Sequence, residues 1–476
     1  MTNITKARPD LQILPMLPHE TLYVGVDIGK KTHIAGFLST TLLSRHQRFE
    51  TCPALSFDNT REGFRALIDR ISTYVPLTQV YVVMEVTGHY HRPLLQYLQE
   101  MEIPTYIMHV QKRQEGLLKS DKRDALGLGN LLFNQLEKGI QVGDPMQAVR
   151  RLVAPTEAAS QLRGMVQHRH ELTVESTQRR NKLTSICDEV FPELTSILKD
   201  PNLPTALALR KRFPTPAALA TASLLALQEV RGKNRSLTDV KLLELQRLAA
   251  QSIGTKEPAR LRGLTFEQEQ LIAELELIQK HLEQLETEMT QIVENSREGQ
   301  ILASIPGIGP SQAAAIIASI GTIANFERAS QLKSYFGWAP SVSQSGYTLD
   351  HVRLTPRGQR QMKHTMYLIV WHTIQNKDCE WSKIYERLVP LKCSFNERTR
   401  QYTGRAKVMG RIAGQIISVI FVLLKRDQET LSQLSFGTKP PEPILYDPKI
   451  HRQHREGHYR ASMQQKPSTV IELPSY

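Results

Sequence analysis

Apolar and polar positions between residues 21 and about 140 alternate in a way that predicts strands and helices in turn. The stretches LYVGVDIG and THIAGFLS have the branched and aromatic content of strands, and RHQRFET could be a third strand of the same meander. The uninterrupted apolar run VYVVMEV, residues 80–86, is typical of a central strand covered on both faces. Helices are predicted for NTREGFRALIDRIS, entered through Asn59 or Thr60, for HRPLLQYLQEM and for KSDKRDALGLGNLLFNQLEKG, and one more strand for IPTYIMHV.

The order of these elements is three strands, then helix, strand, helix, strand and helix, which is the order of the ribonuclease-H-like fold. We therefore expect an α/β domain of this RuvC-like kind over residues 21–154, after an N-terminal extension over 1–20. The chain then becomes mainly helical. This predicts a helical coiled-coil region over 155–299, a mainly helical C-terminal domain over 300–425 and a flexible tail over 426–476.

Apolar residues in the second region are spaced alternately by four and three positions, which is the spacing of a coiled-coil seam. The seam consists of Leu271, Leu275, Ile278, Leu282, Leu285, Met289 and Ile292. Such a seam can pair within a chain or between chains. One long helix packed on its own domain would show the same pattern.

The segment ILASIPGIGPSQAAAIIASIG, residues 301–321, has the composition of two helices joined by a glycine-containing turn. This pattern is typical of a helix-hairpin-helix, in which the amides of Gly307 and Gly309 would face a phosphate group. A plain turn between two helices fits the same residues.

Charge then narrows the expected partners. The 476 residues carry 60 Lys and Arg against 47 Asp and Glu, a formal net charge of +13, and a basic protein attracts polyanions, above all nucleic acid. The cysteines lie far apart, which argues against a zinc site or a disulfide framework and fits a reducing cytosol. The N-terminus lacks the apolar core of a signal peptide, and the apolar run 412–424 is too short to span a bilayer. We expect a cytoplasmic protein without membrane contact.

Carboxylates occur where a metal site would need them. Asp27 ends the first predicted strand, and Glu85 ends the fourth, which lies next to the first in this fold. Asp121 and Asp124 share one face of the last helix. Strand ends are where open α/β sheets build their sites, and four oxygen ligands suit two Mg²⁺ ions. Taken alone, Asp121 and Asp124 could equally be a helix cap and a first-turn partner of the helix dipole.

Three segments make the chain recognisable: VGVDIGKKTH, MEVTGHYHRPLLQYL and KSDKRDALGLGNLL. They resemble the acidic motifs of the DEDD insertion-sequence transposases, the IS one-ten group with the Piv-type invertases. The later segment LASIPGIGPSQAAAIIASIGTIANFERASQLKSYFGWAPSVSQSG is similar to the second signature of that family. The resemblance covers residues 21 to about 425, and it implies a DNA transposase or recombinase.

The resemblance also implies a division of labour. The acidic tetrad of the family, which holds Mg²⁺ against the scissile phosphate, is matched by Asp27, Glu85, Asp121 and Asp124. Ser345, the serine before glycine in SVSQSG, matches the nucleophile, which forms a covalent phosphoserine link to DNA. Its local sequence does not single it out, because Ser341 and Ser343 lie nearby.

The family further implies partners. Its acidic site and its serine meet across protomers, which implies a homo-oligomer, a dimer or a tetramer, with the coiled coil as spacer. Its members are guided by a structured RNA that pairs with donor and target DNA, which implies a guide RNA here. Candidate phosphate contacts, for each of which a solvated helix face fits as well, are Arg163, Arg169, Arg179, Arg180, Arg353, Arg357, Arg360 and Lys363. Pro356 departs from the family, whose members often carry a basic residue there.

Other functions stay open. A RuvC-like structure-specific endonuclease that uses water as nucleophile would share the tetrad but would not need the second signature. A non-catalytic nucleic-acid-binding protein would need neither. A sugar-kinase-like ATPase is first indicated by Asp27, Gly29 and Lys30, but the sequence lacks a convincing second phosphate loop.

Overall fold

The computed structural model of the protein describes residues 15–86, 88–109, 120–139, 149–151, 153–230, 237–345, 349–354, 358–435 and 437–448. The chain forms two compact units. The first comprises Met1–Ala154 together with Ala324–Glu327, and the second comprises Pro155–Ile323 and Arg328–Tyr476.

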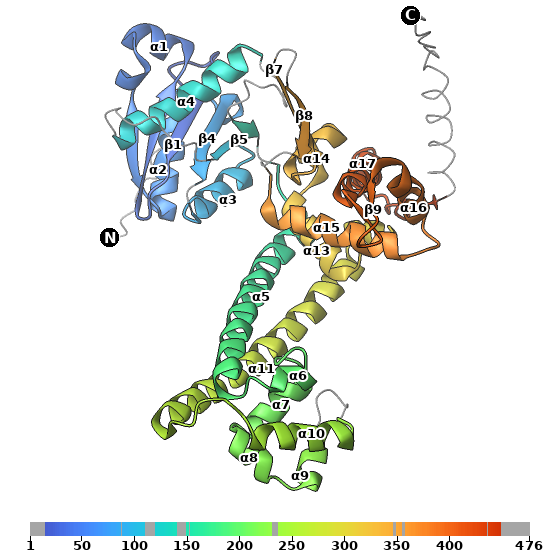
Figure 1. The fold of residues 1–476 in the computed structure, drawn as a ribbon. Helices are drawn as coiled ribbons and strands as arrows, with labels where there is room; N and C mark the ends of the chain where they lie inside the picture. Colours follow the sequence, from blue (N-terminus) through green and yellow to red (C-terminus); the bar gives the residue numbers. More distant parts are fainter. Residues whose placement is uncertain are drawn as a thin grey trace, which may run out of the picture. The chain divides into compact units, whose positions relative to one another are not determined.

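The first unit contains one mixed sheet, whose strands in the described residues have the order β3–β2–β1–β4–β5–β6 (Figure 1). Strand β4 runs parallel to both β1 and β5, and the other neighbours are antiparallel. The strands are β1 (Leu22–Asp27), β2 (Thr32–Leu38), β3 (Ala54–Asp58), β4 (Val80–Val86), β5 (Thr105–His109) and β6 (Arg150–Arg151). The helices are α1 (Thr40–His46), α2 (Arg61–Ser72), α3 (Arg92–Glu100) and α4 (Asp121–Glu137), with 3₁₀ turns at Phe49–Thr51 and Leu77–Gln79. An N-terminal α/β domain is confirmed.

The prediction that RHQRFET is the third strand is wrong. Its first two residues belong to α1, its last three form a 3₁₀ turn, and β3 begins only at Ala54. The physical reason is a helix cap directly after β2, because the Ser39 hydroxyl accepts the backbone N–H of Leu42. The chain therefore turns into a helix before it returns to the sheet.

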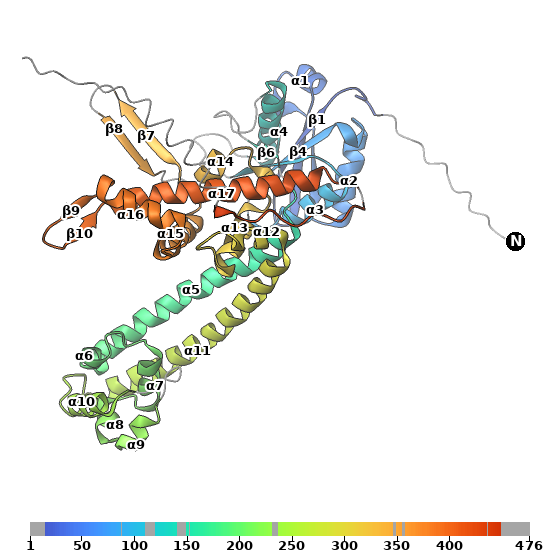
Figure 2. The ribbon, with the colours of Figure 1, turned by 90° about the vertical axis from the view of Figure 1, so that its right-hand side faces the viewer.

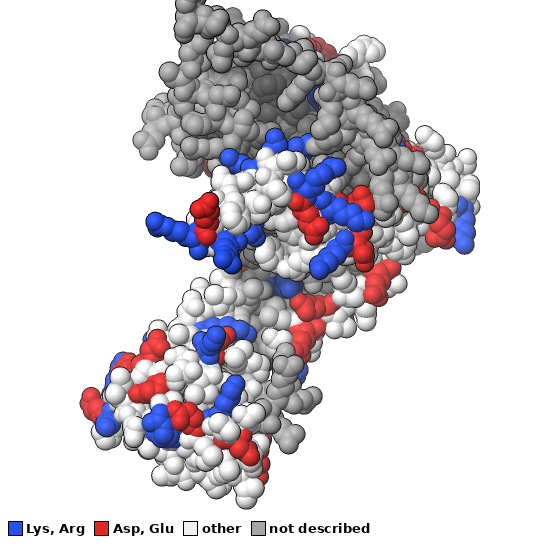
Figure 3. Space-filling view, turned by 45° about the vertical axis from the view of Figure 1, so that its right-hand side comes forward, with Lys and Arg blue, Asp and Glu red and all other residues white. Residues whose placement is uncertain are grey.

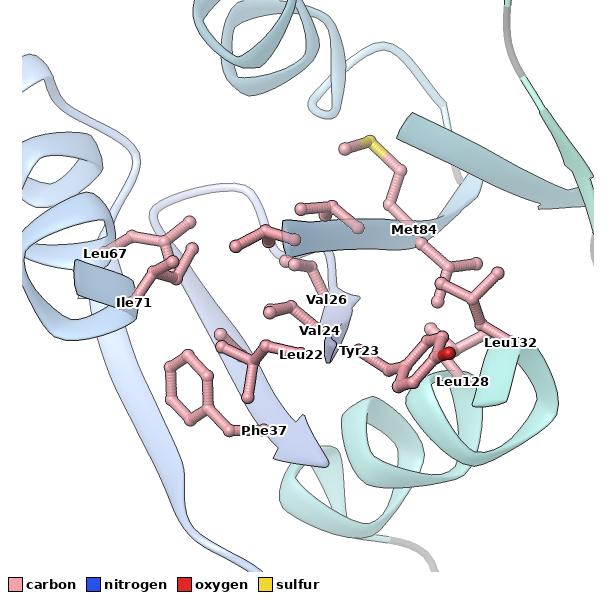
Figure 4. Packing of buried hydrophobic residues seen from close by; sticks show 14 of the residues in the cluster. Leu22, Tyr23, Val24, Val26, Phe37, Leu67, Ile71, Met84, Leu128 and Leu132 are labelled. Carbon is pink, nitrogen blue, oxygen red and sulfur yellow. The ribbon is translucent and has the colours of Figure 1, made fainter. Parts of the chain in front are cut away.

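One face of the sheet is covered by an apolar layer that includes α2 (Figure 4). This helix begins at the predicted cap, where the Thr60 hydroxyl accepts the N–H of Gly63. Its buried residues recur at the spacing of an amphipathic helix. They are Phe64, Leu67, Ile68 and Ile71, and they belong to the same core cluster as Leu22, Val24, Val26 and Phe37.

Helix α4 covers the opposite face of the sheet at unusually close range. A Cβ added to Gly25 on β1 would lie 2.0 Å from the carbonyl oxygen of Ala125 and 2.3 Å from the backbone nitrogen of Gly129. A Cβ on Gly36 of β2 would lie 2.6 Å from the Leu126 side chain. These glycines let the helix backbone approach the strand backbone directly, which no side chain at Gly25 would permit.

Two long helices of the second unit, α5 (Glu157–Val190) and α11 (Pro258–Asn295), lie side by side (Figures 1 and 2). They run antiparallel, because ion pairs join the start of one to the end of the other. The pairs are Arg169–Glu286, Arg179–Glu274, Lys182–Glu267 and Arg260–Glu189. Of the predicted seam, Leu275, Ile278 and Met289 are buried, and the other members are half-buried. A long helical pair within the chain is present, whereas knobs-into-holes packing of a coiled coil stays a prediction.

Between these two helices the chain forms α6 (Leu194–Ile197), α7 (Pro204–Arg212), α8 (Pro216–Thr221), α9 (Leu224–Gln228) and α10 (Asp239–Ala250). They enclose their own apolar cluster, into which the buried Arg210 reaches. Its guanidinium donates to Gln268 Oε1 and to the carbonyls of Pro201 and Leu183, at 2.8–3.1 Å. Because every partner is a neutral oxygen in a fixed place, this cation ties α5, α7 and α11 together without an ion pair.

The mainly helical C-terminal part consists of α12 (Arg297–Ala303), α13 (Pro310–Ile320), a 3₁₀ turn at Ile323–Asn325, α14 (Ala329–Tyr335), α15 (Arg360–Gln375), α16 (Glu380–Lys392) and α17 (Arg405–Ser432). It also contains two hairpins, β7 (Pro340–Ser345) with β8 (Leu349–Leu354) and β9 (Ser394–Asn396) with β10 (Gln401–Thr403). The partly exposed Arg297 forms an ion pair at 2.7 Å with the buried Asp427 on α17.

Helix α17 is long and apolar enough to cross a membrane when it is judged by length and composition alone, and 61% of its most apolar window is buried inside the chain. The predicted tail begins within α17. The described part of the tail is hydrogen-bonded to α12 and the residue after it. Arg297 donates to the carbonyl of Pro441, and the N–H of Tyr446 donates to the Ser304 hydroxyl. The rest of the tail lies outside the described residues.

We predict that Gly25→Ala destabilises the first unit by at least about 2 kcal/mol, because the added methyl group would overlap the backbone of α4. The control is Gly127→Ala on α4, where a Cβ meets nothing within 4 Å. It should stabilise the helix by about 0.5–1 kcal/mol. All tryptophans lie in the second unit, so hydrogen exchange of peptides from β1 and α4 is the measurement. Equal protection in the two variants would contradict the close approach.

Candidate functional site

The first two candidate carboxylates lie on neighbouring strands at the same end of the sheet. Strands β1 and β4 are parallel with Val26 opposite Met84, and Asp27 and Glu85 each follow by one residue. Residues paired in this way point to the same side of a sheet. Asp27 is half-buried, and Glu85 is only 8% exposed.

Helix α4 brings the other two candidates to that end. Along β1, Tyr23 contacts the end of the helix, since its hydroxyl donates to Glu137 Oε1 at 2.7 Å and its ring meets Phe133. Two residues on, Gly25 contacts Ala125 and Gly129. Asp27 is the next residue on this face of β1.

The helix therefore runs antiparallel to β1, and its first turn lies toward the Asp27 end of the strand. That first turn contains both Asp121 and Asp124. The structure thus brings Asp27, Glu85 and the start of α4 to one end and one face of the sheet.

The first turn of α4 is set by its cap. The Ser120 hydroxyl accepts the N–H of Arg123, so neither aspartate is the N-cap residue. Asp121 is exposed and Asp124 is half-buried. Arg123 also reaches Glu50 at 3.4 Å, which holds the helix start against the segment before β3. The cap is therefore provided by serine, and neither carboxylate serves as the N-cap.

The turn that follows Asp27 is fixed by a buried histidine. The N–H of Gly29 donates to His33 Nδ1 at 3.2 Å, and Asn59 bonds to the carbonyls of Lys30 and Lys31. A Cβ on Gly29 would lie 2.2 Å from the carbonyl oxygen of Thr32, so this turn needs glycine. Lys30 and Lys31 themselves are exposed.

Because Nδ1 of His33 accepts a hydrogen bond, the ring is neutral and carries its proton on Nε2. The ring packs between Phe57 and Phe64, and burial lowers its pKa. Sequence reasoning missed this histidine. The available signal was a lone histidine inside an otherwise apolar strand.

The carboxylates have the right chemistry for a hard divalent cation, since each supplies oxygen ligands. Among the described residues, no three His, Cys, Asp or Glu side chains already form a group that could hold a metal ion. What the structure contributes to such a site is therefore the placement of Asp27, Glu85 and the start of α4 at the same end and on the same face of the sheet.

Ser345 lies in the second unit, at the far end of strand β7 and opposite Leu349 of β8. The base of this hairpin is anchored by two glycines. Gly358 has a φ of 102°, and a Cβ there would lie 2.6 Å from the Cα of Gly337. The N–H of Gln359 donates to the carbonyl of Tyr335 close by. The β7–β8 hairpin, whose first strand ends at Ser345, is thus joined to the neighbouring helices where the backbones at Gly337 and Gly358 cross closely.

The turn predicted to face a phosphate packs against another helix at one of its glycines. A Cβ on Gly307 would lie 2.1 Å from Oγ1 of Thr373 on α15, and the residue has a φ of 88°. The N–H of Gly309 donates to Gln312 Oε1 at 3.1 Å at the start of α13. The Gly309 amide thus caps α13, Gly307 permits the close approach of α15, and phosphate contact of the two amides stays a prediction.

The predicted phosphate-binding cations have different surroundings. Arg169 and Arg179 form the cross-helix ion pairs with Glu286 and Glu274. Arg180 and Arg360 are exposed. Arg163 lies near Gly321, and Lys363 is half-buried on α15. Arg357 and the side chain of Arg353 lie outside the described part of the chain. Contact with nucleic acid stays a prediction for each of them.

Comparison with protein families gives two matches in chain order. A DEDD model of the IS110 group, described as "Transposase", matches residues 24–192, and a model described as "Transposase IS116/IS110/IS902 family" matches residues 299–386. The first contains all four carboxylates, and the second contains Ser345.

Individual relatives agree. The chain is 28% identical over 290 residues to "Insertion element IS110 uncharacterized 43.6 kDa protein" of Streptomyces coelicolor. It is 27% identical over 236 residues to "Mini-circle putative transposase for IS117" of the same organism, and 22% identical over 222 residues to an IS116 protein of Streptomyces clavuligerus. These matches cover 58%, 48% and 45% of this chain, and 66%, 54% and 53% of the relatives.

We predict that acid destabilises the first unit in part through His33. Its pKa in the folded state is below the ordinary value of 6.5, so its contribution is complete above pH 6.5 and is lost as the pH falls. His33→Gln should flatten the dependence of stability on pH by up to ~1.4 kcal/mol per pH unit in that range. Hydrogen exchange of β1 and β2 peptides between about pH 8 and pH 5 measures this. The exposed His46→Gln is the control, and an unchanged slope in His33→Gln would contradict the prediction.

Proposed function

Because the chain belongs to the IS110 group of DEDD transposases, we propose that it is the transposase of an insertion sequence, an enzyme that cleaves and rejoins DNA strands. The observation that carries this proposal is the common end and face shared by Asp27, Glu85 and the start of α4. The second family match around Ser345 supports it independently.

The first unit is proposed to be ribonuclease-H-like. Support comes from its sheet, in which three antiparallel strands are followed by two strands added in parallel, in the order β3–β2–β1–β4–β5. Helix α4 then lies across β1 and brings its first turn to the strand ends. This arrangement is suited to a substrate that approaches the sheet at that end.

Mg²⁺ is the proposed cofactor, held by Asp27, Glu85, Asp121 and Asp124. When bound, it would supply positive charge next to the phosphoryl oxygens of the scissile group. The residues of the chain prepare this place. Glu85 is nearly buried on a central strand, which fixes its direction, whereas Asp121 on the exposed helix start can adjust. The hydrogen bond from the Gly29 N–H to His33 Nδ1 holds the turn after Asp27 in one conformation.

Ser345 is the proposed nucleophile. Its Oγ would attack the scissile phosphorus as it loses its proton, and the bond from phosphorus to the leaving deoxyribose oxygen would break while that oxygen is protonated. The resulting phosphoserine ester conserves the energy of the phosphodiester for rejoining. The carboxylates and Ser345 belong to different units of the chain, so the proposed reaction requires both units, of one copy or of two copies, to act on the same phosphate.

The partners proposed for this activity are donor and target DNA, a structured guide RNA and further copies of the chain. The net charge of +13 supports a polyanionic partner, and the long α5–α11 pair offers a surface for assembly. A RuvC-like endonuclease that uses water is the second candidate, and a covalent intermediate distinguishes the two.

We predict that Ser345→Ala abolishes the covalent protein–DNA adduct on a suicide DNA substrate, because no other group would form the phosphoester. Strand rejoining should fall by at least about a thousandfold. The matched control is Ser343→Ala, two residues earlier on the same strand, which should keep adduct formation. An adduct that persists in Ser345→Ala would disprove the assignment, and wild-type cleavage without any adduct would favour the endonuclease.

We also predict that Glu85→Gln, which keeps the volume of the side chain and removes its charge, raises the Mg²⁺ concentration needed for cleavage or abolishes cleavage. A carboxylate that binds a cation loses most of its affinity when it is neutralised. Glu62→Gln, an exposed change in the first turn of α2, is the control. The test is to measure cleavage as a function of Mg²⁺ concentration. If the Mg²⁺ concentration at half-maximal cleavage is unchanged in Glu85→Gln, Glu85 is not a metal ligand.

A further inference from the structure

The β9–β10 hairpin stands between α16 and α17 and presents an aromatic pair to solvent. Phe395 and Tyr402 are directly opposite on the two strands, with ring centroids 5.1 Å apart in an edge-to-face arrangement. Phe395 is 54% exposed, although it belongs to the most apolar residue types. No third strand joins this hairpin in the described part of the chain. Its aromatic face is therefore not part of a core.

The loop at the tip of the hairpin has a defined conformation. The side-chain oxygen of Asn396 accepts the backbone N–H groups of Arg398 and Thr399, and Arg400 has a φ of 50°, in the left-handed region. The Thr403 hydroxyl also donates to the carbonyl of Ser394 across the strands. The arginines at the tip are thus held on a fixed turn.

The hairpin is strongly basic. The segment from 392 to 407 has one carboxylate, Glu397, and its cations are Lys392, Arg398, Arg400, Arg405 and Lys407. All five are exposed, and within the described residues none of them forms a salt bridge with a carboxylate. Figure 3 shows one face of the molecule, on which lysines and arginines lie with carboxylates among them. Within the described residues, the positive charge around the aromatic pair is therefore not neutralised by a salt bridge.

Folding alone gives no reason for this distribution. Arg405 and Lys407 stand in the first turn of α17, where the helix dipole disfavours cations, and that turn contains no acidic residue. Arg405 is turned back toward the hairpin, because its Nε donates to the carbonyl of Tyr402 at 3.1 Å. The helix start thus adds its cation to the aromatic face.

We propose that the β9–β10 hairpin binds unpaired nucleotides of a nucleic-acid strand, with Phe395 as the stacking surface and the surrounding cations on the phosphates. An exposed aromatic ring beside unpaired cations is the combination that binds single strands, because every base has a face that can stack. A duplex would offer phosphates but no free base for the ring. The proposal deepens the proposed function, since it assigns a contact to a protein that acts on nucleic acid. The second family match ends at residue 386, before the hairpin begins.

The test separates stacking from charge in the full-length protein. Phe395→Leu keeps an apolar partner for Tyr402 but removes the flat ring, and Phe395→Trp restores one. Arg398→Gln with Arg400→Asn removes two tip cations, and asparagine tolerates the left-handed backbone at 400. The matched control, Lys241→Gln with Lys280→Gln, removes from α10 and α11 two exposed cations that form no salt bridge within the described residues.

Binding of labelled single-stranded DNA, of RNA of the same sequence and of duplex DNA is measured by fluorescence anisotropy in EDTA over a range of salt. Phe395→Leu should weaken single-strand binding about fivefold or more and leave duplex binding nearly unchanged, and Phe395→Trp should restore it. The slope of the logarithm of the binding constant against the logarithm of the salt concentration should become smaller by about 1.4 for single strands in the Arg398/Arg400 variant. In the control this slope should change much less. The strand that the wild type binds more tightly identifies the source, DNA or RNA.

The proposal is overturned if Phe395→Leu binds single strands like the wild type, or if the Lys241/Lys280 control loses as much affinity. It is also overturned if Phe395→Leu changes only the oligomeric mass of the protein in light scattering, which would make the hairpin a protein interface. Binding is measured without Mg²⁺, so absence of cleavage or of an adduct would refute the proposed function and leave this result intact.

Discussion

The contact on which the first unit depends is the one between two backbones, that of β1 at Gly25 and that of α4 at Ala125 and Gly129. With no side chain between them, the helix lies low on the sheet, and its direction is fixed by Tyr23 and Glu137 at one end. Burial and the nearby Glu137 raise the pKa of the Tyr23 phenol, so it remains a neutral donor. The first turn of the helix is thereby placed at the ends of β1 and β4. A thicker spacer at Gly25 would move both aspartates away from the sheet together.

The second unit also contains close backbone contacts that depend on glycine. Gly337 and Gly358 cross closely at the base of the β7–β8 hairpin, and Gly307 packs against α15 at Thr373. The long helices are joined differently, by an apolar seam and by ion pairs whose side chains are partly exposed. Each exposed pair contributes only about 0–1 kcal/mol, so these charges fix the direction and register of the helices more than they add stability.

Much of this architecture follows from sequence patterns, and the exceptions have identifiable causes. Apolar runs located β1, β2, β4 and β5, and Thr60 was recognisable as a cap. The third strand was misplaced because Ser39 caps a short helix. The spacing of hydrophobic residues does not distinguish this helix from a strand. The carboxylates were proposed as site residues from their order along the chain. The roles of His33, Gly25 and Gly36 depend on which residues meet across the sheet, and one sequence does not contain that information.

The half-buried and exposed positions of Asp27 and Asp121 have a consequence for populations of the gene. Neither side chain fills the core, so a copy that has lost one of these carboxylates still produces a well-folded polypeptide with its basic surfaces intact. If these carboxylates act as proposed, such polypeptides are inactive, and in a cell that carries several copies they would compete with active ones for the same DNA. Decay of the element by mutation would then restrain its remaining active copies, whereas loss of a glycine such as Gly25 would only remove a protein.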